Sequence, residues 1–188
     1  MDYGTGAVMA VPALMELGES VGLSLLAHPT TGLWFVVLVG TASIVADRPA
    51  PKFLLVGAAA AIVAIAWALA YPLRDQLAPM DTTWLQVLEI KDYLVVGQWP
   101  MAAWMSNLAI AAFTFALYGY RRSLGITSQR EGALIAGCGL LLALFLLSVP
   151  FSYAAVALAV QLQFNRVFWL LDFIGIAYLG WLLIESPI

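Results

Sequence analysis

The stretch FLLVGAAAAIVAIAWALAYPL, residues 53–73, lies between Lys52 and Arg74 and contains no charged residue. A bilayer core about 30 Å thick is crossed by a helix of roughly 20 apolar residues, so this stretch has the length of one membrane span. Three more uncharged runs, of 27, 28 and 34 residues, occupy positions 20–46, 93–120 and 132–165. Their recurrence indicates an integral membrane protein built as a helical bundle.

The composition supports this environment. The 188 residues are 63% hydrophobic and 10% charged, whereas a soluble domain carries about 25% charged residues. A water-soluble chain of about 150 residues buries only about 70% of its surface, too little to hide this much apolar area. The net charge of −3 gives no reason to expect a nucleic-acid partner. We expect the lipid bilayer to be the main partner.

Metal and cofactor sites have little support in the sequence. Cys138 is the single cysteine, which excludes an intramolecular disulfide and a thiolate metal cluster. We interpret it as a small packing residue rather than a nucleophile. The chain has one histidine, no His-Glu-x-x-His, no Gly-rich phosphate loop and no Gly-x-Ser-x-Gly. We therefore expect no metal ion and no cofactor.

The longest uncharged run must contain more than one helix. As a single helix, its 34 residues would extend about 51 Å, which exceeds the bilayer core. We expect Pro150 to end the fourth span and residues 151–163 to form a separate short helix, either re-entrant or interfacial. The prediction is an all-α polytopic transmembrane bundle with about five spans, at residues 21–45 (regular from about Thr31), 53–73, 101–120, 132–149 and 167–184.

One long loop, residues 74–100, separates the second and third spans. Thr83 and Gln86 have capping-box spacing, and apolar residues recur after them at helical spacing. This pattern predicts a second short helix over residues 83–96, which either lies on the membrane surface or packs on the bundle. Trp99 and Trp104 are typical of an aromatic belt where the chain re-enters the lipid.

Basic residues predict the orientation. Five of them lie in the short loops 46–52 and 121–131, and three lie on the opposite side. The positive-inside rule therefore places loops 46–52 and 121–131 in the cytoplasm and loop 74–100 outside. We expect a multi-pass protein of the cell inner membrane. The eight basic residues are Arg48, Lys52, Arg121, Arg122 and Arg130 on the first side, and Arg74, Lys91 and Arg166 on the second.

The two ends of the chain differ from the middle. We expect residues 1–19 to form a loosely ordered N-terminal tail and residues 20–188 to form the transmembrane helical domain. Residues 2–13 resemble a segment of the editing domain of leucyl-tRNA synthetases, but the acidic pattern that follows in that family is replaced here by LMEL, residues 14–17. We interpret this resemblance as a chance match or an artefact and transfer no site from it. The chain ends just after the fifth span, and we expect it to be a fragment of a larger polytopic protein.

Polar residues inside apolar runs are costly in a membrane and therefore informative. His28 lies near the end of the first span, either as a donor to a phosphate or sugar or as a helix-end histidine bonded to a nearby carbonyl. Asp172 lies within the fifth span and does not share a helix face with Arg166. Its carboxyl group therefore needs a polar partner on another helix, in either a structural or a functional role.

The densest polar cluster in an apolar region is QLQFNR, residues 161–166. A fork-shaped guanidinium at a membrane surface suits a phosphate or diphosphate. The alternative is an interfacial arginine that extends its charge to the headgroups. We predict that His28, Gln163 and Arg166 bind substrate, and that Gln161 and Asp172 are further buried polar residues.

Three segments together look like the later transmembrane part of bacterial GT-C-type glycosyltransferases: AHPTTGLWF at 27–35, KDYL at 91–94 with Trp99, and QLQFNR at 161–166. The resemblance implies a polyprenyl-phosphate sugar donor at the outer membrane face. It places Gln163 and Arg166 near the donor phosphate and His28 at a span end. The resemblance places the catalytic acid in an early outer loop, which we expect this chain to lack, so no catalytic residue is assigned. The alternatives are a transporter or channel-type bundle and a non-catalytic membrane subunit.

Overall fold

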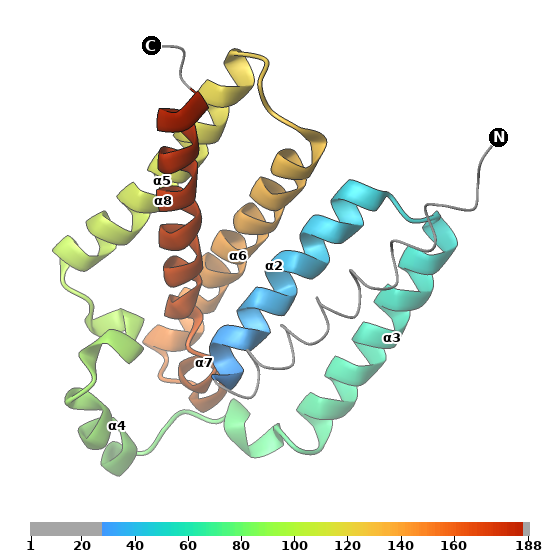
Figure 1. The fold of residues 1–188 in the computed structure, drawn as a ribbon. Helices are drawn as coiled ribbons and strands as arrows, with labels where there is room; N and C mark the ends of the chain where they lie inside the picture. The colour runs from blue at the N-terminus through green and yellow to red at the C-terminus, as the bar shows by residue number, and fades with distance from the viewer. Residues whose placement is uncertain (1–27, 186–188) are drawn as a thin grey trace.

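The computed structural model describes residues 28–185, which form a bundle of long helices with short helical pieces gathered at one end (Figure 1). In this part of the chain there is no β-strand, only an isolated antiparallel bridge between Pro79 and Val156. The long helices are α2 (Pro29–Asp47), α3 (Pro51–Ala70), α5 (Met101–Ser123), α6 (Gln129–Tyr153) and α8 (Val167–Glu185). The short α-helices are α4 (Thr82–Glu89) and α7 (Ala157–Gln161). The 3-10 turns are Arg74–Leu77, Asp92–Leu94, Val96–Gln98 and Phe164–Arg166.

The helical spans agree with the predicted fold class. Five stretches of the described region are long and apolar enough to cross a membrane; the fifth, Ala157–Ile184, includes the short helix α7, and the short helix α4 lies outside all five. The predicted all-α bundle of about five spans with two short helices is therefore confirmed. The predicted tail and the predicted first residues of the first span, 21–27, lie outside the described residues.

Prolines open two of the spans. Pro29 is the first residue of α2, two residues before the predicted regular start at Thr31, and Pro51 is the first residue of α3. Proline is favoured at this position, because its fixed φ suits a helix and its missing N–H would have no partner inside the helix.

We expected the fourth span to end at Pro150, but the helix continues past this residue. Helix α6 continues through Pro150 to Tyr153. Membrane helices tolerate an internal proline, because neighbouring groups satisfy the freed carbonyl. The chain turns after Tyr153, where Ala155 adopts a positive φ of 52°. The separate short helix is confirmed, but it is α7, five residues long, rather than residues 151–163.

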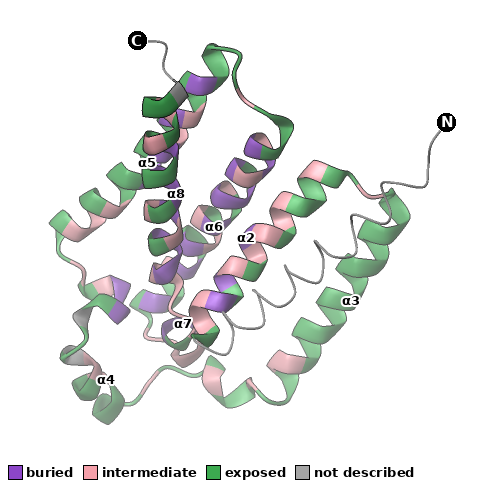
Figure 2. Ribbon diagram, viewed as in Figure 1, coloured by how far each residue is buried: buried purple, intermediate pink, exposed green. Residues whose placement is uncertain are grey.

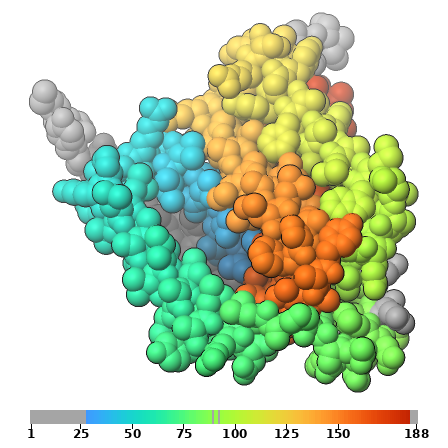
Figure 3. Space-filling model, turned by 180° about the vertical axis from the view of Figure 1, so that it is seen from behind, coloured from blue at the N-terminus to red at the C-terminus, as the bar shows by residue number. Residues whose placement is uncertain are grey.

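The core lies between two helix pairs. Helix α2 packs along α6, and α5 packs along α8. Cys138, Leu141 and Phe145 of α6 and Leu171 of α8 have no exposed surface, which agrees with a packing role for the cysteine. Figure 2 shows these buried positions along α6 and α8, whereas α3 has no buried residue. Seen from behind, α3 forms one edge of the molecule, and the long loop, residues 74–100, runs along the lower edge (Figure 3).

The amphipathic segment of the long loop is shorter than predicted. Asp81, not Thr83, caps it, with Oδ1 accepting a 2.8 Å hydrogen bond from the backbone N–H of Trp84. Helix α4 then ends at Glu89, and two 3-10 turns replace the predicted continuation to Val96. An aspartate satisfies a free N–H at a helix start as well as a threonine does, so both were reasonable caps.

Trp99 and Trp104, predicted to form an aromatic belt where the chain re-enters the lipid, also take part in packing inside the bundle. Both are half-buried and pack against the core. Trp99 lies 5.5 Å from Trp104 and 5.9 Å from Phe145 between ring centroids, and Phe145 lies 4.7 Å from Phe168. This aromatic cluster joins α5, α6 and α8.

At the opposite end of α5, α6 and α8, a buried ion pair connects the same three helices. Arg121, predicted to lie in a cytoplasmic loop, belongs to the last turn of α5 and is 1% exposed. Its Nε donates to Oε1 of Glu131 at 3.0 Å, and its guanidinium lies 4.8 Å from the ring centroid of Trp181. Glu131 also completes a capping box with Ser128 at the start of α6. The pair therefore connects α5, α6 and α8 at the Arg121 end of the bundle.

Candidate functional site

The predicted substrate-binding residues lie together at the loop end of the bundle, formed by residues 71–100 and 154–166. His28 is the N-cap residue of α2, and Gln163 and Arg166 lie between α7 and α8. Helices α2 and α8 both start here, so segments more than 130 residues apart in the chain meet at this end (Figure 1).

Hydrogen bonds connect the three residues through two threonines. The Oγ1 atom of Thr30 lies 3.2 Å from Nδ1 of His28 and donates to Oε1 of Gln163 at 3.3 Å. The same Gln163 oxygen accepts a hydrogen bond from Nε of Arg166. Arg166 Nη1 donates to Oγ1 of Thr31 at 3.4 Å. The predicted set is therefore one polar network, and its role in binding stays a prediction.

Gln163 holds a conformation that is rare for its residue type. Its φ of 48° and ψ of 54° lie in the left-handed region, which costs a non-glycine residue about 1–2 kcal/mol. This backbone turn separates α7 from the 3-10 turn before α8, and the Gln163 carbonyl accepts a 2.9 Å bond from the Arg166 N–H. Strain of this kind concentrates at functional sites.

Arg166 is a buried cation without a buried counter-charge. It is 9% exposed, and no carboxylate of the described residues forms a salt bridge with it. Its guanidinium lies 4.5 Å from the ring centroid of Trp169. Arg121 is the useful comparison, because it is also buried, at 1% exposed, but pairs with Glu131. Of the two buried arginines, only the one at the loop end lacks an acidic partner within the described part of the chain.

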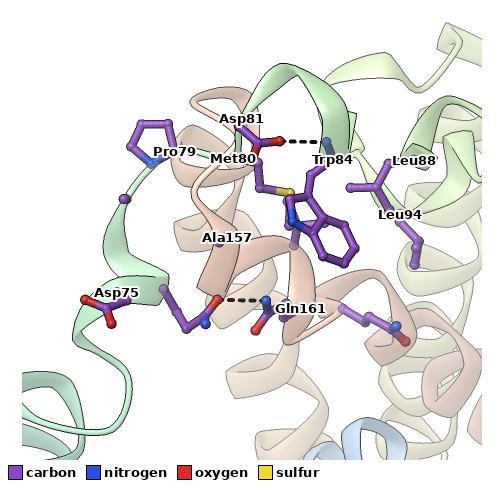
Figure 4. Close-up of a pocket in the computed structure, with 13 residues that line it drawn as sticks. Asp75, Pro79, Met80, Asp81, Trp84, Leu88, Leu94, Ala157 and Gln161 are labelled. Atoms are coloured by element: carbon purple, nitrogen blue, oxygen red, sulfur yellow. Dashed lines mark hydrogen bonds between the residues drawn. The ribbon is translucent and has the colours of Figure 1, made fainter. Parts of the chain in front are cut away.

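Two cavities adjoin this network. Arg166 borders a groove of about 450 Å³ together with Asn107, Asn165 and Trp169. Gln163 borders a second cavity of about 450 Å³. The second cavity lies between α4, α7 and the Arg74–Leu77 turn (Figure 4), and its polar residues include the side chains of Asp75, Asp81 and Gln161. The groove is thus bordered by a positively charged side chain, and the second cavity is bordered by two carboxylate side chains.

Gln161 differs from the prediction. We expected a buried polar residue, but Gln161 is exposed, and its Nε2 donates to Oε1 of Gln76 at 2.8 Å (Figure 4). The bond joins α7 to the Arg74–Leu77 turn across the cavity. Because α7 is short and lies at the end of the bundle, one of its faces remains uncovered.

Asp172 is half-buried in α8, and its Oδ1 atom is enclosed. We predicted that the carboxyl group meets a polar group on another helix or a buried water. Among residues 28–185 no polar group forms a hydrogen bond with this oxygen, so a partner on another helix is not found there. Asp172 also takes no part in the Arg166 network.

Sequence reasoning gave no binding role to four members of the site, although one of them, Asn165, belonged to the polar cluster at 161–166. Thr30 and Thr31 follow directly after His28-Pro29, and Trp169 follows Arg166 by three residues. A cation and an aromatic ring three residues apart on a helix are neighbours, so the pairing with Trp169 could have been predicted. Asn165 donates from Nδ2 to the Tyr93 carbonyl at 3.2 Å, and its Oδ1 has no partner among the described residues.

Comparison with protein-family models, with curated proteins and with solved structures finds no match for this chain. The resemblance to GT-C glycosyltransferases therefore stays a prediction, and any function must be argued from the site itself.

Proposed function

We propose that this chain belongs to a GT-C-type, glycosyltransferase-like membrane protein that handles a polyprenyl-phosphate-linked sugar, with the phosphate bound at Arg166. One observation carries the proposal: Arg166 is nearly buried, has no carboxylate partner among the described residues, and borders a groove of about 450 Å³.

The energetic argument starts from the cost of a buried charge. A buried ion is unfavourable unless a counter-ion and hydrogen bonds compensate for it. Gln163 and Thr31 supply two neutral acceptors, and Trp169 supplies a ring face. A phosphate would supply the missing negative charge. Arginine suits this role, because its planar fork can form two parallel hydrogen bonds to phosphate oxygens.

The position of the groove favours a lipid over a soluble anion. It is bordered by residues at the start of the long helices α5 and α8. A headgroup phosphate lies at the depth where a membrane helix begins. The groove also has apolar and aromatic residues beside its polar ones, including Trp99, Pro100 and Ala103.

The charge distribution supports an outward-facing loop end. Arg121 and Arg166 are buried, so neither contributes to the charge presented by a loop. Without them, four basic residues remain at the Arg121 end and two at the loop end. The excess of basic residues at the Arg121 end therefore remains, and by the positive-inside rule it favours a cytoplasmic location for that end. An outer-leaflet polyprenyl phosphate would then reach the groove.

Binding of polyprenyl phosphate and of the uncharged polyprenol, measured on the full chain in lipid nanodiscs, tests the proposal. We expect the phosphate to bind at least tenfold more tightly, and Arg166→Gln to abolish this preference. Arg122→Gln is the matched control, because Arg122 is exposed and lies at the opposite end of the bundle. Equal binding of the two lipids, or equal effects of the two variants, would contradict the proposal.

A further inference from the structure

Next to the groove that Arg166 borders lies a second group without a partner. The Oδ1 atom of Asn165 is buried and accepts no hydrogen bond from any described residue. The amide orientation is fixed by the other end of the side chain, because Nδ2 donates to the Tyr93 carbonyl. The Tyr93 carbonyl can only accept a hydrogen bond, so the amide nitrogen of Asn165 must face it and the amide oxygen, Oδ1, is the end without a partner. The groove is thus bordered by an unpaired cation and, on the adjacent residue, an unpaired acceptor.

These two groups have opposite requirements. The guanidinium of Arg166 can only donate hydrogen bonds, and the Asn165 oxygen can only accept them. A phosphate without protons satisfies the first and repels the second. Both are satisfied by one ligand if a hydrogen-bond donor lies close to the phosphate, and a hydroxyl group of a sugar is such a donor.

We propose that Asn165 is a specificity residue that accepts a hydrogen bond from a hydroxyl next to the bound phosphate. The site then selects a phosphodiester with a polyhydroxylated headgroup over a diester that lacks hydroxyls. This inference rests on the proposed binding of a lipid phosphate at Arg166. Two lipid classes carry the required chemistry: polyprenyl-phosphate sugars and glycerol-headed phospholipids.

A small side-chain movement is needed. The Asn165 oxygen is enclosed in the structure, whereas the residue itself is half-buried and borders the groove. Its 3.2 Å bond to Tyr93 is at the upper end of the normal range, and rotation of the amide toward the groove gives up this bond. The gain is a partner for an acceptor that is costly to bury alone.

The test compares two pairs of lipids with equal phosphate charge, using the full chain in nanodiscs. One pair is a polyprenyl-phosphate hexose and polyprenyl methyl phosphate, and the other is phosphatidylglycerol and phosphatidylmethanol. We expect the hydroxylated member of the polyprenyl pair to bind about 2- to 12-fold more tightly, from the net value of one hydrogen bond. Asn165→Leu should remove this preference, so that the two members of the polyprenyl pair bind this variant equally. Asn165→Ala serves the same purpose if the leucine variant does not fold.

The outcomes separate the two proposals. A preference that persists unchanged in the Asn165 variants overturns the role of Asn165 but leaves phosphate binding at Arg166 intact. Binding of no phosphodiester, or binding that Arg166→Gln does not weaken, overturns the proposed function itself. A preference confined to the phosphatidylglycerol pair supports the role of Asn165 and overturns the polyprenyl assignment.

Discussion

The close approach of α2 to α6 makes Gly137 the most informative position for testing the fold. A Cβ atom placed at Gly137 would lie 2.8 Å from the backbone oxygen of Leu38 and 2.9 Å from its Cδ1. The oxygen belongs to a helix and cannot move without shifting α2, so overpacking should cost about 1–3 kcal/mol. Gly139 is a matched control on the same helix, because a Cβ there meets nothing within 4 Å.

Both substitutions to alanine carry the same gain in helix propensity, about 1 kcal/mol. The difference between Gly137→Ala and Gly139→Ala therefore isolates the packing cost, and Gly137→Ala should be less stable by about 1–3 kcal/mol. Unfolding of each variant by sodium dodecyl sulfate in mixed micelles, followed by circular dichroism, measures this difference. Equal stability of the two variants would show that α2 does not approach α6 at this point.

Three further predictions concern other parts of the bundle. Arg121→Gln should destabilise the protein by about 3–5 kcal/mol in the same unfolding assay, because it leaves Glu131 buried and unpaired; a loss below about 1 kcal/mol would contradict the buried pair. Ala155→Gly should raise stability by about 1 kcal/mol, because Ala155 has a φ of 52°, and a loss of stability would argue against that turn. A cysteine at exposed Gln129 should react with a membrane-impermeant reagent only from the cytoplasm and one at exposed Gln86 only from outside, with little background from buried Cys138; the reverse labelling would invert the proposed orientation.

The number of spans could be predicted because the length of an uncharged run is a strong constraint in lipid. The run between Lys52 and Arg74 gave α3 to within a few residues. The end of α6 could not be predicted in the same way. A proline stops a helix only where the freed carbonyl cannot be satisfied, and that depends on the neighbouring helices.

The two buried arginines show a second limit. In the sequence, Arg121 and Arg122 are a basic pair next to a span, which is typical of a cytoplasmic loop. Which of the two points inward is decided by the rotation of α5 against α6 and α8, and only Arg121 reaches Glu131. Sequence spacing gives no information on that rotation.

The meeting of His28, Gln163 and Arg166 followed from topology, since the first and fifth spans start on the same side of the membrane. Their connection through Thr30 and Thr31 required the structure, because it depends on how α2 lies beside the turn before α8. Asn165 belonged to the polar cluster found in the sequence, but the enclosure of its oxygen depends on the packing and could not be predicted.

The central claim is that the charge of Arg166 is kept for an anionic ligand rather than for stability. The most direct test is the unfolding free energy of wild type and Arg166→Gln, each with and without polyprenyl phosphate. Removing an unpaired buried charge should leave the ligand-free protein at least as stable as wild type, as in other trade-offs between stability and function. Lipid at 100 times its dissociation constant should stabilise wild type by about 2.7 kcal/mol and should not stabilise the variant. A ligand-free variant that is weakened as much as Arg121→Gln, together with no stabilisation of wild type by the lipid, would make Arg166 a structural residue and contradict the account.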